Sequence, residues 1–216
     1  MRIDGNLVLW KRTNRETGEK IINQIKADAG IDVGNVYHPV GERRRLDING
    51  EEIDLRITLV PCISGQKLAI RILDPKRVKR NLPTLGLTEP QTDHFKQWLN
   101  ELNGMILVTG PAASGKTTTL YALLHELVGD SRHVVTIEDP VEYEIDGINQ
   151  IEVDEKHQLD FAKGVRTSLR LDSDCLMIGE LRESAVARQA IAAAIQGHVV
   201  LSTLHSRDAV SAVTCL

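Results

Sequence analysis

The chain has 216 residues, of which 42% are hydrophobic and 3% aromatic, and its formal net charge at pH 7 is -4. This length suits about one and a half to two domains, and the acidic balance argues against a nucleic-acid coat protein or a polybasic membrane anchor. The three cysteines, Cys62, Cys175 and Cys215, form no C-x-x-C pair, no apolar run is long enough to span a bilayer, and the first residues lack the apolar core of a signal peptide. We therefore expect a protein of the reducing cytoplasm.

The first 74 residues predict a small α/β module with an antiparallel sheet. Residues 52–60 alternate between apolar and polar side chains, and residues 66–73 do the same. Asn49-Gly50 is a strong hairpin-turn signal before the first of these strands, and Ser64-Gly65 provides a turn between the two. The pattern therefore predicts neighbouring strands joined by tight turns.

One helix is expected in the same module, from Thr17 to Ala29. Gly30 directly follows it and is a typical stop residue. Its apolar residues Ile21, Ile22 and Ile25 are expected to pack on the sheet.

Residues 75–88 are predicted to form a linker, because they begin with a basic stretch next to a proline. From Thr88 the pattern changes to alternating helices and strands. Thr88 and Gln91 can form a capping box at the start of the first helix. The elements that follow are expected as strands at 105–109, 133–138, 175–179 and 198–203, and as helices at 116–127, 159–170 and 184–196. This alternation is typical of a mainly parallel sheet, whose active residues gather at the carboxyl ends of its strands.

The most informative segment is residues 110–117, which fit the phosphate-binding pattern G-x-x-x-x-G-K-[ST]. An apolar strand precedes the segment and a helix follows it, so backbone N–H groups and the positive end of the helix can converge on phosphates. Lys116 would reach the β- and γ-phosphates of ATP, and the hydroxyl of Thr117 would complete the coordination of Mg²⁺. The expected nucleotide-binding residues are Gly110, Pro111, Ala112, Ala113, Ser114, Gly115, Lys116, Thr117 and Thr118.

Three further strand ends carry polar residues that suit phosphate chemistry. Glu138 follows one strand, Glu180 follows the next, and His205 follows the last. Acids beside a phosphate loop can hold Mg²⁺ and can orient or deprotonate an attacking water. His205 has two interpretations: its imidazole can sense the γ-phosphate, or it can cap a helix that starts at Ser206.

Taken together, these motifs resemble those of the secretion-superfamily ATPases, which power type II secretion and type IV pilus assembly. The phosphate loop resembles the Walker A motif of that family. The other matching segments are the Asp box at 137–142, the atypical Walker B motif at 172–182, the His box at 197–205, and the stretch Arg2-Ile3-Asp4-Gly5. The resemblance covers nearly the whole chain and keeps the order of the motifs.

The resemblance implies a RecA-like P-loop ATPase domain at 89–216, incomplete at its C-terminus, preceded at 1–74 by part of the family's second N-terminal domain. It also implies a hexameric ring that docks, from the cytoplasm, on platform proteins of the inner membrane. Glu138 is then expected as general base and Glu180 as the acid that positions Mg²⁺ or water. Arg56 and Arg71 are expected to reach the nucleotide, although strand alternation suggests that they lie on different faces of their sheet.

The chain also departs from the family pattern. Ala112-Ala113 stands where the family usually has Thr-Gly, and a left-handed backbone at Ala113 would cost on the order of 1–2 kcal/mol. Ser173, Glu183 and Arg207 also replace the usual residues. The chain begins inside the second N-terminal domain and stops just after the His box, as a truncated homologue or fragment would.

Two other functions stay open on the sequence alone. One is a nucleotide-binding interaction module with little hydrolysis, if the truncation prevents ring assembly. The other is an ATPase that translocates nucleic acid, since P-loop domains also do this. The acidic balance and the few aromatic residues for base stacking count against nucleic acid as a partner.

Overall fold

The computed structural model describes residues 1–3, 6–48, 51–73, 80–129, 131–154, 157–206 and 208–214. The predicted turn at Asn49-Gly50, the Asp4-Gly5 pair, the basic stretch at 74–79, and Arg207 and Cys215 lie outside these residues. The chain divides into two compact units, Met1–Pro75 and Lys76–Leu216.

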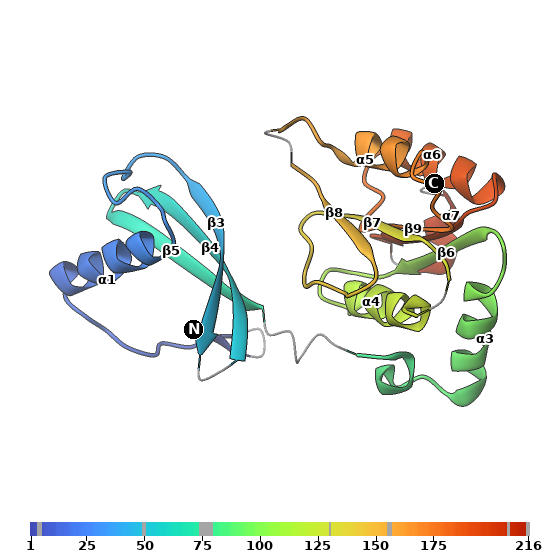
Figure 1. Ribbon diagram of the computed structural model, residues 1–216. Helices are drawn as coiled ribbons and strands as arrows, with labels where there is room; N and C mark the ends of the chain where they lie inside the picture. Colours follow the sequence, from blue (N-terminus) through green and yellow to red (C-terminus); the bar gives the residue numbers. More distant parts are fainter. Residues whose placement is uncertain are drawn as a thin grey trace. The chain divides into compact units, whose positions relative to one another are not determined.

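The first unit is a helix packed on an antiparallel sheet, as expected. A short pair of strands, β1 (Arg2–Ile3) and β2 (Asn6–Leu7), precedes the helix α1 (Arg15–Asp28). The sheet has the order β3-β4-β5, formed by β3 (Val40–Ile48), β4 (Glu51–Cys62) and β5 (Gly65–Leu73) (Figure 1). A turn joins β4 to β5 as expected, but its residues are Ile63 and Ser64 rather than Ser64-Gly65, because Gly65 already belongs to β5 and pairs with Cys62. Strand β3 was not predicted, because its run of three arginines hides the alternation.

The packing face of α1 is narrower than the sequence suggests. Ile25 and Ala29 contact the sheet residue Ile57, whereas the side chain of Ile21 is 50% exposed, so the expectation that Ile21 packs on the sheet is wrong. Ile22 is half-buried, and Lys26, four positions after Ile22 and three before Ala29, shares that side of the helix. Lys26 is fully buried, and its Nζ donates to the carbonyl oxygens of Val33 and Asn35 at 3.2 and 2.8 Å.

The second unit is a five-stranded parallel sheet between helices, again as expected. The strand order is β6-β10-β9-β7-β8. The strands are β6 (Gly104–Thr109), β7 (Val134–Glu138), β8 (Asn149–Glu152), β9 (Cys175–Ile178) and β10 (Val199–Leu204). The helices are η1 (Leu82–Leu85), α3 (Glu89–Leu99), α4 (Lys116–Leu127), α5 (Phe161–Ser168), α6 (Ser184–Ile195) and α7 (Ala209–Thr214). Helix α3 begins with the expected capping box, in which the backbone N–H of Thr88 donates to Oε1 of Gln91 at 2.9 Å.

The sheet separates two hydrophobic cores. Helix α4 covers one face together with η1 and α3, and helices α5 and α6 cover the other (Figure 1). Leu82, which was expected in a linker, is fully buried in the first of these cores. Along β7 the side chains alternate, so Val134 joins the α4 core while Val135 and Ile137 join the other.

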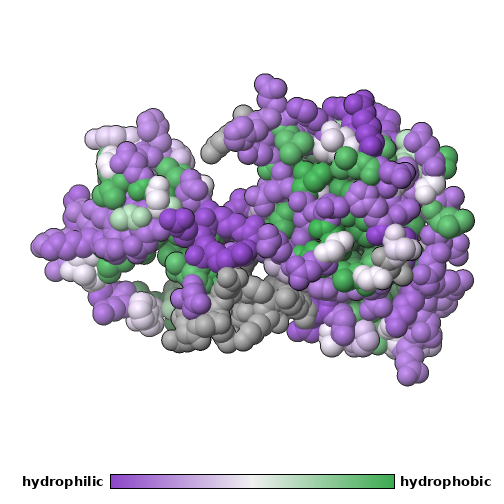
Figure 2. Space-filling view, viewed as in Figure 1, coloured by the Kyte–Doolittle hydropathy of each residue, from purple (hydrophilic) through white to green (hydrophobic). Residues whose placement is uncertain are grey.

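The described part of the chain includes no helix that is both long and apolar enough to pass through a lipid bilayer. Figure 2 shows hydrophilic residues over most of the visible face of both units, with smaller hydrophobic areas among them.

Candidate functional site

The phosphate loop of the second unit runs from the end of β6 to the start of α4. Gly110 and Gly115 have φ angles of 155° and 94°, and α4 begins directly after Gly115. A Cβ on Gly110 would lie 2.7 Å from Oγ of Ser114, so the first turn of the loop leaves no room for a side chain. Ala113 also adopts a left-handed conformation, with a φ of 59°, which costs on the order of 1–2 kcal/mol for an alanine.

Lys116 points back over this loop. Its Nζ donates to the carbonyl oxygens of Gly110 and Pro111, each at 3.0 Å, and lies 3.3 Å from Nδ1 of His205. An ammonium group has three protons, and these three partners can take all of them. A phosphate that binds in the loop would therefore exchange these contacts for stronger, charge-assisted ones.

Glu180 extends this row of polar groups. Its Oε1 lies 3.0 Å from Nε2 of His205, and its Oε2 accepts a hydrogen bond of 2.8 Å from Nε of Arg182. The sheet register explains the meeting of these residues. Ser202 pairs with Ile178, and Leu204 pairs with Thr109, so His205, Glu180 and the phosphate loop all follow strand ends at one edge.

A cavity of about 240 Å³ opens at this edge of the sheet. Its lining includes Lys116, Thr117, Glu138, Glu142, Glu180 and His205. The structure thus brings together Lys116, Thr117 and the three residues that were predicted at strand ends. Among the described residues, no three His, Cys, Asp or Glu side chains are grouped closely enough to hold a metal ion by themselves. The hydroxyl of Thr117 and the carboxylate of Glu180 nevertheless suit Mg²⁺. This ion prefers oxygen ligands and usually takes a few from the protein and others from the phosphates of its substrate.

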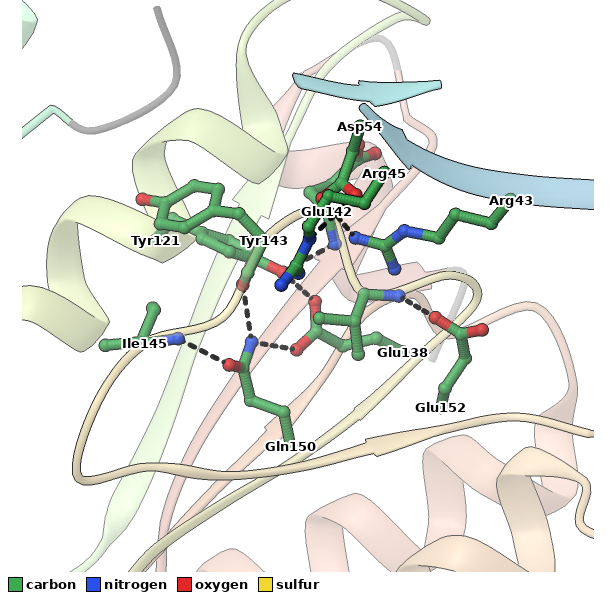
Figure 3. A network of polar contacts seen from close by, with 11 residues as sticks. Arg43, Arg45, Asp54, Tyr121, Glu138, Glu142, Tyr143, Ile145, Gln150 and Glu152 are labelled. Atoms are coloured by element: carbon green, nitrogen blue, oxygen red, sulfur yellow. Dashed lines mark hydrogen bonds and ion pairs between the residues drawn. The ribbon is translucent and has the colours of Figure 1, made fainter. Parts of the chain in front are cut away.

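Glu138 lies deeper than the other acids, with only 3% of its surface exposed. By strand alternation it shares the α4 face of β7 with Thr136, whose Oγ1 donates to Oε1 of Glu138 at 2.6 Å. Nε2 of Gln150 donates to the same oxygen at 3.2 Å, and the hydroxyl of Tyr121 donates to Oε2 (Figure 3). Burial raises the pKa of Glu138 above its ordinary value, and the three hydrogen bonds oppose that rise.

The loop after Glu138 is held by side chains rather than by regular secondary structure. The backbone N–H groups of Val141, Glu142 and Ile145 donate to Glu152, Tyr121 and Gln150 at 2.9, 3.0 and 2.7 Å. Glu142 is half-buried and lines the cavity. No motif of the sequence predicts a separate role for Tyr121, Glu142 or Gln150. One feature of the sequence could have pointed to them. Thr136 and Glu138 lie on one face of a buried strand, and buried polar side chains need hydrogen-bond partners inside the core.

Arg56 and Arg71 lie in the first unit, and both are exposed. They are paired directly across β4 and β5, and Arg43 of β3 pairs with Arg56 on the other side. Directly paired residues project from the same face of a sheet, so the expectation that Arg56 and Arg71 lie on different faces is wrong. The opposite face carries Leu55 and Ile57, which pack against the α1 core.

Comparison with known proteins gives a consistent result. The sequence model of the family described as type II/IV secretion system protein matches residues 1–216. The type II secretion system ATPase E of Vibrio cholerae is 39% identical over 215 residues, which is 100% of this chain and 43% of that protein. The putative type II secretion system protein E of Escherichia coli K12 is 40% identical over 215 residues and is covered to 44%. The chain therefore spans less than half the length of these relatives.

Solved structures show the same fold. The pilus retraction motor PilT with bound ADP matches 99% of this chain and 62% of its own, with a TM-score of 0.76 and 27% identity. The Legionella pneumophila ATPase DotB matches 96% of this chain and 58% of its own, with a TM-score of 0.73 and 24% identity. At that identity the second match bears on the fold alone.

Proposed function

This chain belongs to the type II/IV secretion system protein family, and on that premise we propose that it is the ATP-binding and ATP-hydrolysing part of a motor for type II secretion or type IV pilus assembly. The observation that supports this most directly is the row Lys116, His205 and Glu180 above the phosphate loop, with contacts of 3.3 and 3.0 Å. Through this row, the cation Lys116 and the acid Glu180 line the same cavity at the start of α4, as phosphoryl transfer requires.

The loop binds the phosphates in this proposal. The first N–H groups of α4 and the loop amides face the phosphate oxygens, and Lys116 leaves the carbonyl groups of Gly110 and Pro111 for the β- and γ-phosphates. Mg²⁺ would neutralise charge that develops on the phosphate oxygens. Thr117 would bind the ion through its hydroxyl, and Glu180 would orient the ion's water ligands or the attacking water.

Two acids compete for the role of general base. The sequence predicts Glu138, but both of its carboxylate oxygens already accept hydrogen bonds from buried donors. To take a proton from water, Glu138 must first give up one of these hydrogen bonds, although its raised pKa favours the proton once it is bound. Glu142 lines the same cavity and is half-buried. We therefore propose Glu142 as the alternative base, with Glu138 holding the loop that carries it.

Substitution of Lys116 tests the binding site. Lys116→Ala is expected to weaken the binding of a fluorescent ATP analogue by at least about 100-fold and to leave the fold intact, because it removes the loop's cation. Lys163→Ala is a matched control, since Lys163 is an exposed lysine of α5. Unchanged affinity in Lys116→Ala would mean that the loop is a structural turn.

Single-turnover rates separate the two acids. If Glu138 is the base, Glu138→Gln retains ATP binding and loses turnover, whereas Glu142→Gln hydrolyses ATP normally. If Glu142 is the base, Glu142→Gln loses turnover, whereas Glu138→Gln, which keeps the size and a hydrogen-bonding oxygen of the side chain that holds the loop, retains most of it. Glu144→Gln, in the same loop and exposed, serves as the control. Normal rates in both Glu138→Gln and Glu142→Gln would exclude either acid as the base and move that role to Glu180.

The assembled motor is part of the same proposal. We expect a homo-hexameric ring that works in the cytoplasm and docks on inner-membrane platform proteins, as the family resemblance implies. If the wild-type chain binds ATP but shows no turnover at any protein concentration, it would instead be a nucleotide-binding interaction module. A rate that rises on addition of DNA would favour nucleic acid as the partner.

A further inference from the structure

Tyr121 is the largest fully buried side chain in the core beneath α4. It lies five positions after Lys116 on the same helix. Its ring packs on that of Tyr143, with the ring centroids 4.7 Å apart and a tilt of 52° (Figure 3). An aromatic ring at this place needs no explanation, because a leucine or phenylalanine would fill a core equally well. Its hydroxyl does need one.

The hydroxyl of Tyr121 makes two contacts that no phenylalanine can make. It donates to Oε2 of Glu138, and it accepts a hydrogen bond of 3.0 Å from the backbone N–H of Glu142. The first contact supplies a buried carboxylate with one of its donors, which such a group requires. The second contact fixes the backbone at Glu142, which lines the cavity. One oxygen atom therefore joins the end of β7 to the loop that follows it.

Helix α4 connects these contacts of Tyr121 to the phosphate loop, where the reaction would take place. The start of α4 holds the phosphate loop, and a helix is a rigid element over one or two turns. Tyr121 therefore attaches the loop of Glu142 to the same element that carries Lys116. Glu152 and Gln150 hold residues 139–145 from the sheet side, and Tyr121 adds the contact that ties the separation between bound phosphates and the acids of that loop to α4. Reacting groups must be held closely, since a misplacement of about 1 Å can cost about 100-fold in rate.

We propose that Tyr121 is a positioning residue for ATP hydrolysis, whose hydroxyl holds the loop of Glu142 at a fixed distance from the phosphates. This proposal rests on the proposed function. Tyr121 touches no substrate in it and acts through Glu138 and Glu142. It applies whichever of these two acids takes the proton, because the hydroxyl contacts both residues.

The test compares two tyrosines of one cluster. Tyr121→Phe removes the hydroxyl that holds the loop. Tyr143→Phe removes the partly buried hydroxyl of the neighbouring ring, which lies 2.9 Å from Nε2 of His125 instead of bonding to Glu138. We expect Tyr121→Phe to lower kcat by about 10- to 100-fold, with KM for ATP and the affinity for an ATP analogue within about twofold of wild type. Tyr143→Phe should keep kcat within about twofold. A wild-type kcat in Tyr121→Phe would overturn the proposal.

A second measurement does not depend on turnover. Hydrogen exchange at the amide of Glu142 should become about fivefold faster in Tyr121→Phe, because that N–H loses its acceptor. Unchanged exchange there would also overturn the proposal. A wild-type chain without any ATP turnover would contradict the proposed function, and the exchange result would still show whether Tyr121 holds the loop.

The double variant Tyr121→Phe/Glu138→Gln covers the case in which Tyr121→Phe alone fails to fold. It removes the buried charge that the single change leaves with one donor fewer. If the double variant folds, its amide exchange at Glu142 must still exceed that of Glu138→Gln. Equal exchange in these two variants would count against Tyr121.

Discussion

Lys116 and His205 determine each other's hydrogen-bonding roles. Nζ of Lys116 lies 3.3 Å from Nδ1 of His205, and an ammonium group can only donate, so Nδ1 must accept. Nε2 then carries the ring proton and donates to Oε1 of Glu180 at 3.0 Å. The three residues form a row in which each hydrogen bond is donated toward Glu180.

This relationship predicts the tautomer of His205. Ring-nitrogen NMR at neutral pH should show Nε2 protonated and Nδ1 as a hydrogen-bond acceptor. In Lys116→Met the resonance of Nδ1 should shift, because that nitrogen loses its donor, while Nε2 stays protonated toward Glu180. His94 on α3 provides an internal control in both samples. A proton on Nδ1 in the wild-type protein would contradict the assignment.

The buried carboxylate of Glu138 predicts a pH-dependent stability. Its pKa is raised in the folded state, so the folded protein binds this proton more tightly than the unfolded chain does. The stabilisation is complete below the ordinary carboxyl pKa and is lost as pH rises through the raised value. The free energy of unfolding of Glu138→Gln, relative to wild type, should therefore increase as the pH rises above the ordinary carboxyl pKa. Urea unfolding at several pH values measures this difference, and a flat difference would contradict the raised pKa.

The left-handed backbone of Ala113 predicts a stabilising change. Ala113→Gly should increase the free energy of unfolding by about 1 kcal/mol, because glycine adopts a φ of 59° without strain. Ala112→Gly is the matched control. Ala112 does not have a positive φ, so glycine there should give no gain and should cost up to about 1 kcal/mol. An equal effect of the two changes would show that the strain at position 113 is absent in solution.

Gly164 lies where α5 approaches the sheet. A Cβ on Gly164 would lie 2.9 Å from Cγ2 and 3.2 Å from Cγ1 of Ile137. Gly164→Ala should therefore lower the free energy of unfolding by about 1–3 kcal/mol. In an Ile137→Ala background both clashing atoms are gone, and the same change should cost little or nothing. An undiminished cost in that background would mean that Ile137 is not the cause.

The paired arginines predict how activity depends on assembly. Arg56 and Arg71 lie side by side on one sheet face, so both can approach one phosphate group at the same time. If a neighbouring subunit supplies the site to which they bind, the ATPase rate per subunit should rise with protein concentration. Arg56→Ala/Arg71→Ala should abolish that rise and lower the rate at high concentration by roughly 10³-fold. Arg15→Ala, on the exposed face of α1, is the control. A fast rate in a monomer, independent of concentration, would contradict this mechanism.

Much of the second unit could be predicted because its signals are local. The apolar run of β6, the glycines of the loop and the leucines of α4 each specify their own conformation. Strand β8 escaped prediction because its residues are polar and partly exposed, and they become a strand only by pairing with β7. The role of Tyr121 escaped for a related reason, since nothing along α4 distinguishes its ring from the leucines around it.

The error over Arg56 and Arg71 came from register. Alternation along one strand tells which of its residues share a face, but it does not relate one strand to the next. The turn does relate them: Cys62 pairs with Gly65, and counting outward along β4 and β5 brings Arg56 opposite Arg71. The length of the turn between residues 62 and 65 therefore held the information that alternation alone could not supply.

Each unit contains one buried reactive side chain whose chemical modification would report the opening of that unit. The amine of Lys26 in the first unit and the thiol of Cys175 in the second are both inaccessible in the folded chain, and burial raises the pKa of Cys175 to about 12. Acylation of Lys26 therefore requires the first unit to open, and alkylation of Cys175 requires the second. The exposed thiol of Cys62 reacts without any opening and can be blocked beforehand. Peptide mass spectrometry on one sample can then time the opening of the two units separately.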